Sequence, residues 1–220
     1  MAQLAITAGT LSGRLIQCPN SPHVRPTTAR VRKSVMAWMQ HACNWHDGFI
    51  LDCFAGSGIL GLEFLSTGAR GVVALEKHRT QATAISKAAT TLKVSEQLLV
   101  IPQAVETVCQ QNSASQWHQW QARYAASHPR VFLDRAVFTG FTGILADPPY
   151  GYTQWDLLLD KWATQGWLTP TSGWLLLESH ADDGLAKTLA QLCQTHARYQ
   201  HARVDEKTYG ETVIHRVWWP

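Results

Sequence analysis

Several features that would mark other classes of protein are missing from this sequence. No two cysteines form a C-x-x-C pair, and the five cysteines are odd in number and widely spaced. They indicate neither a disulfide framework nor a zinc knuckle, and we interpret them as the reduced thiols of a cytoplasmic protein. The sequence has no stretch of about 18 purely apolar residues, which argues against a transmembrane helix. The first ten residues, MAQLAITAGT, lack the positive segment and apolar run of a secretion signal.

Acidic residues are also missing from the first 46 positions, which carry a formal charge of +5. The rest of the chain has 14 basic and 16 acidic residues, a charge of −2. A basic arm on a nearly neutral body favours a polyanionic partner, and an ordinary solvated basic face is the alternative. The cluster RPTTARVRK at residues 25–33 favours the polyanion.

The basic segment leads into a predicted helix over residues 29–42. Thr27 or Thr28 can cap this helix, because either side chain can accept a hydrogen bond from a free amide of the first turn. Apolar residues recur at helical spacing behind the cap, which leaves Arg30 and Lys33 off the apolar face. Helix N-terminal amides and arginines together make a good phosphate site.

Strand-like and helix-like segments alternate along most of the chain. The length of 220 residues and the 45% hydrophobic content suit one packed domain, or one domain with a small appendage. Two short strands are expected within residues 4–17. The later strands are expected at 49–53, 72–75, 98–102, 143–146, 174–178, 198–204 and 212–219. The later helices are expected at 60–66, 78–92, 106–111, 155–164 and 184–196. This alternation predicts an α/β fold with a mainly parallel sheet covered on both faces.

Residues 112–136 interrupt the alternation. The segment has no clean period, and we expect a surface insertion with a short helix at 116–125. The alternative is an aromatic and basic platform for RNA, formed by four of its side chains: Trp117, Trp120, Arg123 and Tyr124.

A glycine-rich turn follows the first predicted strand of the parallel sheet. Residues 56–61 (GSGILG) match G-x-G-x-x-G, and Glu76 ends the next strand. Glycines allow close backbone approach to a ligand and an acid can hold ribose hydroxyls, so a dinucleotide and S-adenosylmethionine (SAM) both fit. Asp52, just before the turn, favours SAM because it can receive the cationic amino end of the methionine. The simpler alternatives are a loop-ordering Asp52 and an exposed acid at Glu76.

A second motif, Asp-Pro-Pro-Tyr at residues 147–150, follows the strand at 143–146. Methyl transfer to an exocyclic amine needs acceptors that draw the amine hydrogens toward tetrahedral geometry. The Asp147 carboxylate and the Pro148 carbonyl are such acceptors, and the prolines hold them rigidly. Tyr150 offers a flat face for a splayed-out base. This chemistry needs no metal. A proline-rich turn with a helix-capping Asp is the alternative.

Together these motifs resemble the RsmD-type 16S ribosomal RNA (guanine-N2)-methyltransferases. The matching segments are GTLSGR at 9–14, RPTTARVR at 25–32, LDCFAGSGILGLEFLSTGA at 51–69, LEK at 75–77, ADPPY at 146–150 and LLLES at 175–179. The resemblance covers most of the chain and is weakest over 103–140. It implies a Rossmann-like class I SAM-dependent methyltransferase fold, with a seven-stranded and mostly parallel sheet, an antiparallel C-terminal strand and a small N-terminal extension.

The resemblance also assigns roles to individual residues. The cofactor SAM would be bound by Asp52, Phe54, Gly56, Gly58, Glu76 and Lys77, with Gln103 as the candidate for its adenine. The guanine would be held by Asp147, Pro148 and Tyr150. The RNA would be contacted by Arg25, Thr27, Arg30, Arg32 and Tyr150.

The expected organisation is a basic extension at 1–46 and a methyltransferase domain at 47–220. The resemblance implies 16S rRNA as the partner, within the 30S subunit or an assembly intermediate, and a monomeric enzyme. Ala29 and Lys33 depart from the Asp and Glu that are frequent in the family, and both changes make the arm more positive.

Three other functions fit part of the pattern. A DNA adenine or protein glutamine methyltransferase would also use Asp-Pro-Pro-Tyr, although 220 residues leave little room for a DNA-recognition domain. A dinucleotide-dependent oxidoreductase explains the glycines but leaves residues 147–150 unused. A non-catalytic RNA-binding protein could keep the same scaffold.

Overall fold

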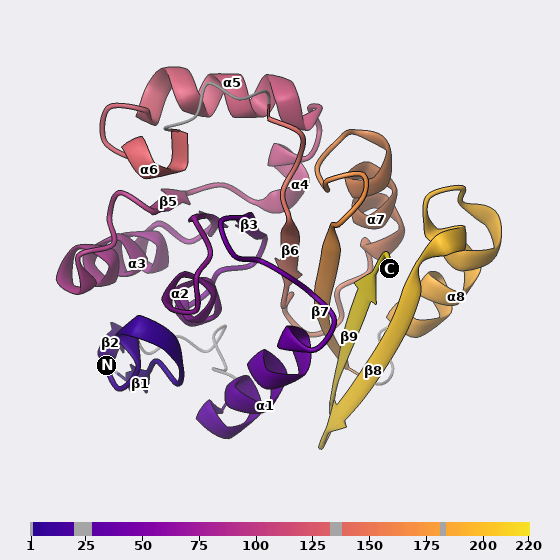
Figure 1. Cartoon of the computed structure of the whole chain (residues 1–220), viewed down its shortest axis with the longest axis horizontal. Helices are drawn as coiled ribbons and strands as arrows, with labels where there is room; N and C mark the ends of the chain where they lie inside the picture. Colours follow the sequence, from indigo (N-terminus) through magenta and orange to yellow (C-terminus); the bar gives the residue numbers. More distant parts are fainter. Residues whose placement is uncertain (1, 20–27, 133–137, 181–183) are drawn as a thin grey trace.

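The computed structural model describes residues 2–19, 28–132, 138–180 and 184–220. Its central element is a seven-stranded sheet with the order β5-β4-β3-β6-β7-β9-β8 (Figure 1). In that order the strands are β5 (Leu98–Ile101), β4 (Gly71–Leu75), β3 (Phe49–Asp52), β6 (Gly143–Ala146), β7 (Trp174–His180), β9 (Thr212–Trp218) and β8 (Arg203–Tyr209). The first five run parallel, and β9 is antiparallel to both β7 and β8. The expected class I methyltransferase architecture, including the antiparallel C-terminal strand, is confirmed.

Helices cover both faces of this sheet (Figure 1). One face is covered by α1 (Ala29–Gln40), α2 (Ile59–Ser66) and α3 (Arg79–Leu92). The other is covered by α4 (Val105–Val108), α5 (Ser113–Tyr124), α6 (Pro129–Phe132), α7 (Trp155–Thr164) and α8 (Leu185–Thr195). Neighbouring strand residues point to opposite faces, so Ile50 joins the α1–α3 core and Leu51 joins the α4–α8 core. Both are fully buried, as expected for a parallel strand covered on two sides.

The N-terminal segment forms a separate two-stranded hairpin, β1 (Ala2–Ala5) with β2 (Leu15–Cys18), followed by α1. The Thr28 hydroxyl accepts a hydrogen bond from the Val31 amide and caps α1, as one of the two predicted caps would. The hairpin, α1 and α2 meet at Glu63, which is fully buried.

The buried Glu63 carboxylate accepts hydrogen bonds from three donors. The amide and hydroxyl of Thr7 each donate at 2.9 Å, and Arg32 Nε donates at 3.2 Å. Arg32 is itself 2% exposed, and its Nη2 also donates to the carbonyl of Ala5. The prediction that Arg32 contacts RNA is therefore wrong for this structure, because its guanidinium is used inside the protein to join the hairpin to α2.

Two further predictions from the sequence are corrected. The predicted strand at 198–204 is a 3-10 turn (Tyr199–His201) followed by β8, because Tyr199 is buried and its hydroxyl donates to the Leu159 carbonyl at 2.9 Å. The aromatic platform in 112–136 is absent from the described part of that segment, because Trp117 and Trp120 are buried in the α4–α8 core. The expected short helix is α5, which packs both tryptophans against that core.

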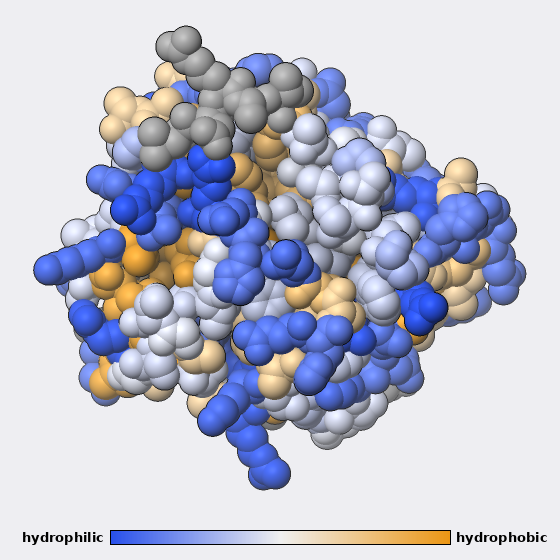
Figure 2. Space-filling model, in the orientation of Figure 1, coloured by the Kyte–Doolittle hydropathy of each residue, from blue (hydrophilic) through white to orange (hydrophobic). Residues whose placement is uncertain are grey.

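The part of the surface seen in Figure 2 is mainly hydrophilic, with scattered apolar patches. No helix among the described residues has the length and apolar character needed to cross a membrane. All five cysteines are free thiols.

Candidate active site

The carboxyl ends of β3 and β4 hold the glycine-rich turn. Gly56 and Gly58 have φ of 53° and 75°, a left-handed conformation that favours glycine. A Cβ on Gly58 would also lie 2.8 Å from a methyl group of Ile85. The amide of Ala55 donates to the carbonyl of Leu75 at 3.0 Å, so the turn is tied to the end of β4. The two glycines thus keep the backbone open in front of the N-terminus of α2.

Asp52 ends β3 beneath this turn, and its environment is unusual for a carboxylate. The side chain is 3% exposed, and its Oδ2 has no hydrogen-bond partner among the described residues. Burial raises the pKa of Asp52 to about 7, the charge of Glu76 adds to the rise, and the amides of Phe54 and Gly61 oppose it. A buried polar atom without a partner is costly, so this oxygen is a candidate ligand contact.

Glu76 follows β4 and holds the turn in place. Its Oε2 accepts a hydrogen bond from the Gly56 amide at 2.9 Å, and its Oε1 accepts one from the His78 amide at 2.7 Å. The alternative of an exposed acid here is wrong, because Glu76 is 7% exposed. Each carboxylate oxygen keeps acceptor capacity for a further donor, such as a ribose hydroxyl.

The Asp-Pro-Pro-Tyr segment begins at the end of β6. Asp147 is solvent-exposed, and Tyr150 is 60% exposed. The ring of Tyr150 meets that of His180, the last residue of β7, edge to face with 4.1 Å between centroids. This contact holds one edge of the tyrosine while leaving much of its surface open to a ligand. The sequence interpretation missed His180, although its place at a strand end could have marked it.

Desolvation raises the pKa of Asp147 above its ordinary value, and the negative charges of Glu178 and Asp52 raise it further. Solvent reaches this side chain and screens part of both effects. Glu178 lies in β7, Asp52 ends β3 and Asp147 directly follows β6 between them, so acidic residues gather at the carboxyl ends of these strands.

The remaining predicted cofactor residues surround the turn. Phe54 is half-buried and packs edge to face against Tyr152, which in turn donates a hydrogen bond to Glu106 at 2.9 Å. This brace between the turn, α4 and the segment after Asp-Pro-Pro-Tyr was not predicted. Lys77 and Gln103 are exposed just beyond the ends of β4 and β5, where a ligand across the turn could reach them.

Apart from Tyr150, described above, the predicted RNA contacts fall into three groups. Arg30 is exposed in the first turn of α1, as predicted. Arg32 is buried, as described above. Arg25 and Thr27 lie outside the described residues.

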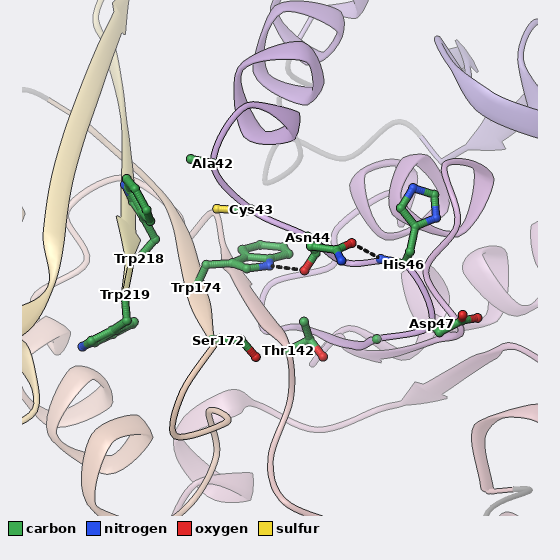
Figure 3. A pocket seen from close by; sticks show the side chains of 12 residues that line it. Ala42, Cys43, Asn44, His46, Asp47, Thr142, Ser172, Trp174, Trp218 and Trp219 are labelled. Atoms are coloured by element: carbon green, nitrogen blue, oxygen red, sulfur yellow. Dashed lines mark hydrogen bonds between the residues drawn. The ribbon is translucent and has the colours of Figure 1, made fainter.

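A pocket lies at the amino ends of the parallel strands (Figure 3). It has a volume of about 390 Å³ and includes Gly48, Thr142 and Gly173, the residues that precede β3, β6 and β7. Ligands of open α/β sheets bind at the carboxyl ends of the strands. This pocket is therefore separate from the site of Asp52 and Asp147.

Comparison with known proteins agrees with this geometry. A family model described as conserved hypothetical protein 95 matches residues 4–134. Ribosomal RNA small subunit methyltransferase D of Escherichia coli (strain K12) is 30% identical over 183 residues, which cover 83% of this chain and 78% of the relative. The chain belongs to this methyltransferase family.

Two other similarities concern a shorter part of the sequence and the fold. The protein of the same name from Haemophilus influenzae is 41% identical over 103 residues, covering 46% of this chain and 52% of the relative. The solved yhhF structure from Escherichia coli, described as a methyltransferase, superimposes with a TM-score of 0.73 at 24% identity, covering 99% of this chain and 98% of the other. Methyl transfer thus explains both motifs, whereas a dinucleotide-dependent oxidoreductase explains only the glycines.

Proposed function

We propose that this enzyme transfers a methyl group from SAM to the exocyclic N2 of a guanine in 16S rRNA. The observation that carries the proposal is the shared location of the two motifs. The glycine-rich turn with Asp52 and Glu76, and the Asp147–Tyr150 segment, lie at the ends of adjacent parallel strands. The family relatives are named as ribosomal RNA small subunit methyltransferases.

The residues at the turn fit SAM. Asp52 Oδ2, buried and without a partner, suits the cationic amino group of the methionine part. Glu76 suits the ribose hydroxyls, and the open backbone at Gly56 and Gly58 allows close approach. When bound, SAM supplies a methyl group on a positively charged sulfur, which an amine can displace in line.

The Asp147–Tyr150 segment suits the guanine. The Asp147 carboxylate and the Pro148 carbonyl accept the hydrogens of the N2 amine and turn its lone pair away from the ring. Tyr150, held at one edge by His180, stacks on the flipped base. Most of the acceleration then comes from positioning the amine.

The RNA-binding part of the proposal concerns residues 1–46 as a basic extension on a methyltransferase domain at 47–220. Arg30 is exposed and Arg25 and Thr27 precede it in the same basic segment. We propose that this segment contacts rRNA phosphates within the 30S subunit or an assembly intermediate. The enzyme would act as a monomer in the cytoplasm, where the small subunit assembles.

The test is methyl transfer from labelled SAM to unmodified 30S particles, with free 16S RNA and duplex DNA as parallel acceptors. The modified nucleotide is then mapped. Label on the N2 of one guanine in 16S rRNA is the expected result. Label on DNA adenine or on protein would overturn the proposal, as would SAM binding without transfer to any RNA.

A further inference from the structure

Glu178 lies beside Asp147 because of the register between β6 and β7. Ala146 and Leu177 are direct partners in this parallel pair, so the residues that follow them, Asp147 and Glu178, come next on adjacent strands. Glu178 is still held in the sheet opposite Ile214 of β9. The backbone thus fixes the position of this carboxylate next to the amine-binding motif.

The two carboxylates also share a face of the sheet. Leu145 and Leu176 belong to the core on the α1–α3 side, whereas Ala146 and Leu177 belong to the core on the other side. Because side chains alternate along a strand, Asp147 and its neighbour Glu178 both project toward the α1–α3 side.

Asp52 projects toward that same side, since its Oδ2 lies 3.3 Å from where a Cβ on Gly61 of α2 would be. Asp52 is the direct partner of Leu145 in the β3–β6 pair. Asp147 comes two residues after Leu145, so it lies about 7 Å farther along the strand direction than Asp52. The cofactor and base sites thus lie side by side on one face.

We propose that Glu178 is a specificity-determining residue that accepts the N1 hydrogen of the target guanine. The inference rests on the proposed function and names a second contact in the same site. Guanine presents two neighbouring kinds of donor on its Watson–Crick edge, N1–H and the N2 amine. Paired carboxylates from β6 and β7 match that pair, with Asp147 on the amine and Glu178 on N1–H.

The same pair rejects other bases with an exocyclic amine. Adenine and cytosine place a ring nitrogen that is an acceptor next to their amine, and this lone pair would face the Glu178 carboxylate. A site built to accept a hydrogen bond discriminates strongly against an analogue without the donor, because its own group is left unsatisfied. The Asp-Pro-Pro-Tyr motif alone does not distinguish these amines. The neighbouring carboxylate does.

The experiment combines a change in the protein with a change in the base. 30S particles are reconstituted with 16S RNA carrying either guanine or 2-aminopurine at the mapped position. 2-Aminopurine keeps the exocyclic N2 amine but has an acceptor at N1. Single-turnover methyl transfer and competitive binding of the two particles are measured for the wild type, Glu178→Gln and the control Glu96→Gln. Glu96 is an exposed acid just before β5, which is an edge strand of the sheet and is not adjacent to β6 or β7.

Glutamine keeps the shape of Glu178, lacks its charge and can donate a hydrogen bond to N1 of 2-aminopurine. The wild type is expected to prefer guanine, and Glu178→Gln to reduce that preference by about 10- to 100-fold in rate or in binding. SAM affinity and melting temperature should stay unchanged, and Glu96→Gln should behave as the wild type. An equal effect on both bases, or no effect on either, would overturn the role of Glu178. Failure of the wild type to methylate guanine would instead overturn the proposed function.

Discussion

Glu63 and Asp52 are both almost completely buried, yet their surroundings differ. The Glu63 carboxylate accepts hydrogen bonds from Thr7 and from Arg32, and the positive charge of Arg32 balances its negative charge. Asp52 keeps Oδ2 without a partner among the described residues, and its pKa is raised to about 7. The first arrangement stabilises the attachment of the N-terminal hairpin. The unpaired Asp52 carboxylate lowers the stability of the fold, and a cationic ligand that binds it would compensate for this cost.

The contrast extends to the two ends of α2. Its C-terminal half carries the Glu63 network, where Ser66 Oγ also accepts a hydrogen bond from the Leu11 amide at 2.8 Å. Its N-terminus faces the turn with Gly56 and Gly58 and the carboxylates at the strand ends. One helix thus joins a structural region to a functional one. Mutations at the two ends of α2 should therefore affect stability and catalysis independently.

The largest expected effect is on catalysis. Asp147→Asn should lower the single-turnover rate of methyl transfer by about 10²- to 10⁴-fold, because a neutral amide is a weaker acceptor for the amine hydrogens. SAM affinity, measured by calorimetry, should change by less than about threefold, since Asp147 is assigned to the base. Equal losses in rate and in SAM affinity would contradict that assignment.

The next effect is on stability. Glu63→Ala leaves Arg32 buried without its partner and should lower the free energy of unfolding by about 3–5 kcal/mol, measured by denaturant titration. The double variant Arg32→Met/Glu63→Leu removes both charges and should be more stable than the single variant. A single variant as stable as the wild type would show that the network does not stabilise the fold.

Asp52 should make the stability of the fold depend on pH. Its folded-state pKa of about 7 exceeds its ordinary value of 3.8, so the folded state binds the extra proton between these values. The Asp52 contribution to stability therefore falls as pH rises from about 4 to 7, by an amount on the order of 4 kcal/mol. Asp52→Asn should remove this slope and be more stable than the wild type at pH 8.

Asp52→Asn should also bind SAM more weakly than the wild type at pH 8, by about tenfold or more, because a charge-assisted hydrogen bond to the cofactor is lost. In the wild type, SAM affinity should increase as pH rises through about 7, where Asp52 ionises. Calorimetric titrations at pH 6 and pH 8 test both statements. An unchanged SAM affinity in Asp52→Asn would remove this residue from the cofactor site.

The smallest expected effect is on RNA binding by the basic segment. Arg30→Ala should weaken binding and reduce the slope of log K against log salt concentration by about 1 unit. Lys187→Ala is the matched control, because Lys187 is an exposed cation on α8, away from the basic segment. Equal slopes for the two variants would exclude Arg30 from the RNA contact.

Local sequence signals predicted most of the fold and the motifs of the site. The bounds of β6 and α7 were predicted correctly, because each combines a regular apolar pattern with clear turn residues. The glycine turn was found because its backbone conformation restricts the residue type. The predicted strand at 198–204 failed because the long-range hydrogen bond from Tyr199 to Leu159 outweighs local propensity.

What the sequence could not predict depends on partners far apart in the chain. Arg32 looked like one of several cations in a basic segment, and only the fold brings Glu63 beside it. Glu178 looked like the end of an apolar strand, and only the register of β6 with β7 places it next to Asp147. The periodicity of apolar residues indicates which face of a helix or strand is buried. It does not indicate which distant residue packs against that face.

The division between structural and functional carboxylates is tested most directly by comparing Asp147→Asn with Glu63→Gln in one measurement. Single-turnover methyl transfer to 30S particles is followed at saturating SAM and saturating particles, and each rate is divided by the folded fraction of that variant. We expect the rate to fall at least about 100-fold for Asp147→Asn and to stay close to that of the wild type for Glu63→Gln. Similar rates for the two variants would contradict the division between structural and functional carboxylates.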